Sequence, residues 1–124
     1  MSAFLAKPWL GLVVALAATT SAQAQPQTAQ VAIIEPAFQP PSAWTYDPAE
    51  LTVKVGTTVT WTNQGAVLHT VTVTADAVTA TGIQFDSGDL RHGESFSFTF
   101  ETVGTFAYYC RYHLWMTGTV VVVP

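Results

Sequence analysis

The chain has 124 residues and a formal net charge of −4 at pH 7, with four Lys and Arg residues against eight Asp and Glu residues. This acidic balance argues against nucleic acid as a partner, because neutralising phosphates requires clustered basic side chains. The length fits a short leader followed by one small domain.

The first 24 residues are typical of a secretory signal peptide. Lys7 is followed by an apolar run from Trp9 to Ala18, and the small residues after it end in Ala22-Gln23-Ala24, which fits a cleavage signal. The apolar run is too short to cross a bilayer, and no cysteine stands near the cleavage point to carry a lipid. We therefore expect export to the periplasm without a membrane anchor, leaving one domain of residues 25–124.

The exported part contains a single cysteine, Cys110. Small exported domains usually carry cysteines in pairs, as disulfides. One unpaired cysteine implies a bridge to another chain, a free thiol, or a thiolate bound to a metal.

The first strand is expected at residues 30–34. Four prolines then confine residues 35–48 to loop or edge-strand positions. Three aromatic residues of this segment, Phe38, Trp44 and Tyr46, are expected to pin it to the body of the domain.

The rest of the chain is dominated by short strands in which inward and outward residues alternate. The residues that share a face in successive strands are Leu51, Val53 and Val55; Val59, Trp61 and Asn63; His69, Val71 and Val73; Phe96, Phe98 and Phe100; and Phe106, Tyr108 and Cys110. Glycine-containing turn sequences separate these runs, and a valine-rich strand from about Gly118 closes the chain. This pattern predicts an all-β, antiparallel sandwich or barrel.

Four side chains form a candidate metal site. His69 begins one strand and Cys110 ends another, both on inward faces. A short loop then carries His113 and Met116, which is the only methionine besides the initiator. Two imidazoles, a thiolate and a thioether are the donors of the blue-copper electron-transfer site, in which His₂Cys lies in a plane and Met is a weak axial ligand. Zinc is the main competing metal.

Each of these residues has an ordinary structural interpretation when taken alone. A lone inward histidine is usually hydrogen-bonded in a core, a lone buried cysteine is an inert small hydrophobe, and a methionine fills gaps. The combination favours a metal, because the unpaired thiol and the only mature methionine fall in one C-x2-H-x2-M loop.

Residues 51–123 resemble the cupredoxins, the plastocyanin-like blue copper proteins. The resemblance rests on "LTVKVGTTVTWTN", "HTV" and "FSFTFETVGTFAYYCRYHLWMTGTVVV", and the short ligand loop is most similar to that of the amicyanin subfamily. It implies a Greek-key β-sandwich with one copper ion, held by His69, Cys110 and His113 with Met116 as the axial ligand. It also implies that Asn63 hydrogen-bonds across to the cysteine-bearing loop.

The resemblance implies an electron carrier and not an enzyme, since four protein ligands leave no open position for a substrate. The expected exit for electrons is His113, within an apolar docking patch formed with Val67, Leu68, Leu114 and Trp115. The third histidine, His92, is expected to be a solvated loop residue. Trp115 could instead pack inward as a lid over the site.

We expect a monomer that shuttles single electrons between a dehydrogenase-type donor and a cytochrome-type acceptor. Two alternatives remain at this point. One is a copper-binding or copper-delivery protein that uses the same fold without electron transfer. The other is a structural β-sandwich without metal, which leaves Cys110 unexplained.

Overall fold

The structure is a computed structural model that describes residues 11, 14, 15 and 27–124. Apart from three isolated residues, the expected signal peptide at residues 1–24 lies outside the described residues. Within the part of the chain that is described, no helix is long and apolar enough to cross a membrane.

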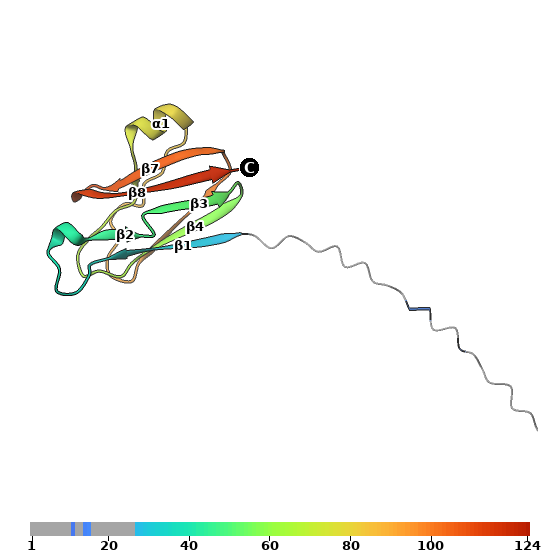
Figure 1. Cartoon of the computed structure of the whole chain (residues 1–124), viewed down its shortest axis with the longest axis horizontal. Helices are drawn as coiled ribbons and strands as arrows, with labels where there is room; N and C mark the ends of the chain where they lie inside the picture. The colour runs from blue at the N-terminus through green and yellow to red at the C-terminus, as the bar shows by residue number, and fades with distance from the viewer. Residues whose placement is uncertain (1–10, 12–13, 16–26) are drawn as a thin grey trace, which may run out of the picture.

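The described chain forms eight strands in two layers (Figure 1). The strands are β1 (Thr28–Ile34), β2 (Thr45–Asp47), β3 (Glu50–Lys54), β4 (Thr57–Asn63), β5 (Thr72–Val73), β6 (Ser95–Phe100), β7 (Gly104–Cys110) and β8 (His113–Val123), with a 3₁₀ turn at Pro41–Ala43 and one helix, α1 (Ala75–Thr81). One sheet has the strand order β2-β1-β4-β6, and the other has the order β3-β8-β7-β5. The expected β-sandwich is confirmed.

The alternating pattern predicts the inward faces of the central strands correctly. Val59, Trp61 and Asn63 of β4 are buried, as are the alternate residues of β7 that end at Cys110. The indole of Trp61 lies 5.4 Å from the ring of Tyr108, between ring centroids. Because β4 and β7 belong to different sheets, this contact joins the two layers of the core.

The sheets are mixed and not wholly antiparallel. Strands β1 and β4 run parallel, with Ile33 opposite Asn63, and β3 and β8 also run parallel. The expected antiparallel pairing therefore holds for the other strand pairs but not for these two. Alternation reports which face of a strand is buried, but it carries no information on the direction of the neighbouring strand.

The last strand begins earlier than expected, at His113 instead of about Gly118. Tyr109 pairs with Thr117, whereas Cys110 pairs with His113, so β8 contains three additional residues opposite the end of β7. Such a bulge bends the strand and redirects side chains. The ligand loop is thus a tight turn at residues 111–112 followed by a bulged strand.

The proline-rich segment 35–48 is attached to the domain at its second half. Its second half contains β2, an edge strand of its sheet as predicted, in which Tyr46 is fully buried. Trp44, just before β2, is half-buried. Phe38 does not contribute, because its side chain is fully exposed in a turn where its φ is 63°. The expectation that Phe38 pins the segment is wrong.

Candidate metal centre

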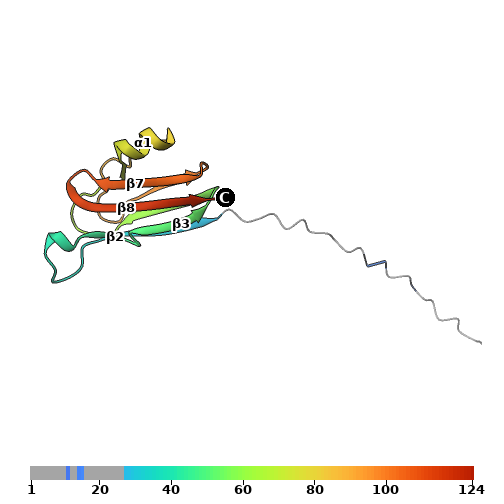
Figure 2. The ribbon, with the colours of Figure 1, turned by 45° about the horizontal axis from the view of Figure 1, so that its top comes forward.

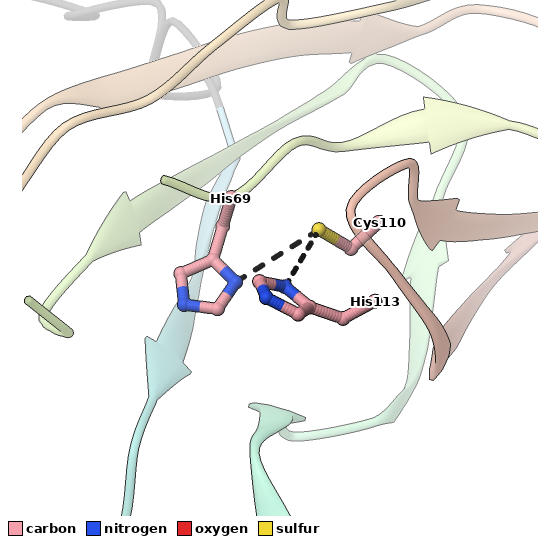
Figure 3. Close-up of side chains that lie close together, drawn as sticks. All are labelled: His69, Cys110 and His113. Atoms are coloured by element: carbon pink, nitrogen blue, oxygen red, sulfur yellow. Dashed lines mark hydrogen bonds between the residues drawn. The ribbon is translucent and has the colours of Figure 1, made fainter. Parts of the chain in front are cut away.

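Three of the four predicted ligands meet at one point (Figure 3). The candidate donor atoms of His69, Cys110 and His113 all lie within 4.8 Å of one another. The sulfur of Cys110 is 3.8 Å from Nδ1 of His69 and 3.4 Å from Nδ1 of His113. Both imidazoles therefore turn the same ring nitrogen toward the thiol, as a shared ion would require.

The fold brings these residues together from distant parts of the sequence. His69 lies between β4 and β5, where its backbone exchanges two hydrogen bonds with Leu90. Cys110 ends β7 and His113 begins β8. The site consequently lies at the end of the sandwich opposite the C-terminus, where β8 begins (Figure 2).

Met116 faces the interior from the bulged part of β8. Its side chain is only 1 % exposed, and the inward alternation continues from it through Gly118, Val120 and Val122. Leu114 and Trp115, which precede it, are both exposed. The bulge breaks the strict alternation of the strand. It allows Leu114 and Trp115 both to face outward, so that Met116 faces inward.

Thr70 links the two ligand-bearing segments. Its backbone N–H donates to the Cys110 sulfur at 3.4 Å, and its hydroxyl oxygen accepts from the backbone N–H of Arg111 at 2.9 Å. Thr70 is fully buried. Thr70, which follows the ligand His69, thus binds both the thiol of Cys110 and the turn that leads to His113.

Asn63 does not make the hydrogen bond that was expected of it. Its amide group donates to the carbonyl oxygens of Val67 and Leu90, and its amide oxygen accepts from Gly65 N–H. These partners belong to the segments around His69 and not to the cysteine-bearing loop, so the expectation is corrected. Asn63 stiffens the His69 side of the site, while Thr70 provides the crossing hydrogen bond.

The thiol of Cys110 lies in surroundings that favour its ionised form. Burial opposes ionisation, but hydrogen bonds from His69, from the backbone of Thr70 and Tyr112 and from His113 outweigh it and lower the pKa of Cys110 from 9.0 to about 6. Burial likewise opposes the charged form of His69, yet its bonds to Cys110 and Glu35 raise its pKa. The surroundings of Cys110 therefore favour its thiolate, which is the form of cysteine that binds a metal.

Glu35 is a site residue that the sequence did not reveal. Its Oε2 lies 2.8 Å from Nε2 of His69, on the side of the ring away from Cys110. Burial opposes ionisation of Glu35, but hydrogen bonds from His69 and from the backbone of Ala66 and Val67 lower the pKa of the carboxyl group. No motif marks this residue, because its contact depends on the path of the chain after β1.

Trp44 is the second residue whose role at the site was missed. Its indole meets the ring of His69 edge-on at 5.7 Å and the ring of His113 at 5.0 Å, measured between centroids. It was expected only to anchor the proline-rich segment. Instead it covers the two imidazoles. The only sequence feature that marked Trp44 was its place as an aromatic residue between prolines.

Three of the four loop residues between the ligands, Arg111, Tyr112 and Trp115, are bonded to neighbouring segments. Arg111 forms an ion pair with Asp86 at 2.9 Å, and the Tyr112 hydroxyl donates to Asp89 at 2.6 Å. The Trp115 indole N–H donates to the carbonyl oxygen of Pro41 at 3.1 Å, while half of the side chain stays exposed. Trp115 is therefore not a buried lid.

Apolar side chains are exposed around the ligands. Val67 and Leu68 are each 37 % exposed, Trp115 is 51 % exposed and Leu114 is 71 % exposed. His113 is half-buried, whereas His69 and Cys110 are completely buried. His92 is exposed as expected and bonds through Nδ1 to the carbonyl oxygen of Gly65.

The donor set fits copper better than other common metals. His69, Cys110, His113 and Met116 offer imidazole, thiolate and thioether groups, and none is the hard oxygen ligand that magnesium or calcium prefers. A thioether suits copper and is unusual among zinc ligands. The four side chains are positioned to form a type 1 copper site.

Comparison with known proteins points to the same metal. The family described as copper binding proteins, plastocyanin/azurin family, matches residues 40–123. The chloroplastic plastocyanin of Tetradesmus obliquus is 37 % identical over 89 residues, which are 64 % of this chain and 59 % of that protein. The amicyanin of Paracoccus denitrificans is 38 % identical over 77 residues, or 62 % of this chain and 57 % of that protein. The chain thus spans less than two thirds of the length of these two relatives.

A solved structure shows a similar fold. It is described as a novel purple cupredoxin from Nitrosopumilus maritimus, and it is 34 % identical in sequence with a TM-score of 0.64. The similarity covers 77 % of this chain and 99 % of the cupredoxin.

Proposed function

Since this chain belongs to the plastocyanin/azurin family of copper-binding proteins, we propose that it carries single electrons through one copper ion. The observation that carries this proposal is the closed site: two fully buried ligands, a buried thioether and one half-buried histidine. When bound, copper supplies the Cu(I)/Cu(II) couple.

The protein residues would hold the ion in a geometry that suits both oxidation states. Nδ1 of His69, Nδ1 of His113, the thiolate of Cys110 and the thioether of Met116 would hold the ion. Thr70 and Asn63 fix the backbone on which these ligands stand. A site held in this way needs little rearrangement when an electron arrives or leaves.

We assign the exit for electrons to His113, because it is the ligand that solvent can partly reach. Val67, Leu68, Leu114 and Trp115 would form the apolar docking patch around it. Weak redox complexes bury little surface, and an apolar patch of this kind suits brief contact.

The biological context is proposed from the sequence. The signal-peptide pattern of residues 1–24 supports cleavage and a periplasmic location for a monomeric domain of residues 25–124. There the protein would accept electrons from a dehydrogenase-type donor and pass them to a cytochrome-type acceptor.

Repeated redox cycling tests carriage of electrons against delivery of copper. Copper-loaded protein is reduced with ascorbate and reoxidised with ferricyanide over several cycles, in the presence of a Cu(I) chelator. An electron carrier keeps its copper and recovers its full Cu(II) spectrum after each cycle. Transfer of copper to the chelator on first reduction would contradict the proposal and favour a delivery protein.

A further inference from the structure

We propose that Glu35 is the positioning residue of His69, and that Gly65 is the residue that makes room for it. This inference rests on the proposed copper site. It gives a role to the start of the proline-rich segment 35–48, which contains none of the four proposed ligands.

Glu35 determines which nitrogen of His69 is free to bind a metal. Its Oε2 already accepts the backbone N–H of Val67 at 3.2 Å, so it is an acceptor there and Nε2 of His69 carries the hydrogen toward it. In the neutral ring that binds a metal, the lone pair is then on Nδ1, which faces the Cys110 sulfur. The His69 ring is fully buried and the Glu35 side chain is 14 % exposed, so water competes little for this bond.

Gly65 leaves the space that the Glu35 carboxylate occupies. A Cβ atom at position 65 would lie 1.9 Å from Oε2 of Glu35 and 2.4 Å from its Cδ. The backbone of Gly65 is held on both sides, because its N–H donates to Asn63 and its carbonyl oxygen accepts from His92. A side chain at position 65 would therefore displace the carboxylate and not the backbone.

The pairing of β1 with β4 delivers these two residues to the same place. Ile33 lies opposite Asn63, and the Gln64 N–H donates to the Ile33 carbonyl oxygen at 2.9 Å. Glu35 and Gly65 lie two residues after this pair, just beyond the ends of β1 and β4. The carboxylate thus reaches His69 because β1 runs parallel to β4.

A carboxylate bonded to the distal nitrogen makes an imidazole a stronger donor. A stronger donor stabilises Cu(II) more than Cu(I), so it lowers the reduction potential. Loss of such a partner typically weakens metal binding by about 10- to 100-fold. If Cu(II) binding weakens tenfold relative to Cu(I) binding, the potential rises by about 59 mV for a one-electron couple.

The test compares the wild type with E35Q and G65A. E35Q removes the charge and keeps the size, whereas G65A leaves Glu35 in the chain and moves it by steric conflict. Alanine has no backbone conflict at position 65, since the φ of Gly65 lies outside the left-handed region. E101Q removes the same charge from an exposed turn between β6 and β7 and is the matched control.

Three quantities are measured: the reduction potential by voltammetry, the Cu(II) affinity by competition with a chelator, and the protonated ring nitrogen of His69 in the Cu(I) protein by nitrogen NMR. We expect an upward shift of potential and weaker Cu(II) binding in both E35Q and G65A, with no change in E101Q. The wild type should show hydrogen on Nε2 of His69.

Unchanged potential and affinity in both variants would overturn the inference, provided that the wild type is blue and redox-active. A wild type that binds no copper would overturn the proposed function itself. A shift in E35Q without one in G65A would overturn the role assigned to Gly65. If E35Q does not fold, G65A decides the matter, because Glu35 remains present in it.

Discussion

At the scale of single residues, the site is built from a few polar groups buried together. Thr70 serves both the thiol and the following turn, and Asn63 binds the segments that hold His69. Cys110 is surrounded by donors although its side chain is fully buried. The preference for a thiolate is therefore a property of the folded protein before any metal binds.

This preference predicts an acidic thiol in the metal-free protein. The ultraviolet absorbance of the thiolate should be present at neutral pH and disappear as the pH falls through about 6, instead of through the ordinary value of 9.0. A pH titration of the metal-free protein measures it, with C110S as the matched control that lacks the signal. A midpoint near 9 would show that the hydrogen bonds to Cys110 do not favour its ionisation.

At the scale of elements, the proline-rich segment 35–48 covers the ligands. Glu35 at its start bonds to His69, Trp44 lies against both imidazoles, and Pro41 accepts the indole N–H of Trp115. Three separate contacts thus hold one segment over the site. We expect this cover to limit access of solvent and chelators to the two histidines.

Substitution of Trp44 by alanine should open this cover. We expect faster loss of copper to a chelator and a free energy of unfolding lower by roughly 1–3 kcal/mol, less than for a fully buried tryptophan. Stopped-flow chelation and urea unfolding measure the two effects. F38A is the control from the same segment, because Phe38 is fully exposed and should change neither quantity. Equal copper release from W44A and wild type would contradict the covering role.

At the scale of the whole molecule, the sandwich places ligands from distant segments at one end. Alternation in the sequence predicted the buried faces of β4 and β7, and with them the inward direction of Cys110. The donor set and the C-x2-H-x2-M spacing predicted the four ligands. Alternation and ligand spacing involve residues close together in the chain, so they can be recognised in a single sequence.

The features that the sequence did not predict depend on contacts between distant segments. The direction of β1 against β4 decides where Glu35 lies, and the register of β7 against β8 creates the bulge before Met116. Helix α1 was also missed, although Thr74 caps its start and Gly82 its end. Seven residues are too few to display a helical period.

We assign His69, Cys110, His113 and Met116 to a type 1 copper centre, and the visible spectrum of the copper-loaded protein reports on this assignment. Cu(II) added to the purified protein should give an intense blue colour from thiolate-to-copper charge transfer. C110A should be colourless, whereas M116L should stay coloured with a shifted reduction potential, because an axial ligand tunes the metal without being needed to hold it. A colourless wild type with bound Cu(II), or a blue C110A variant, would contradict the claim.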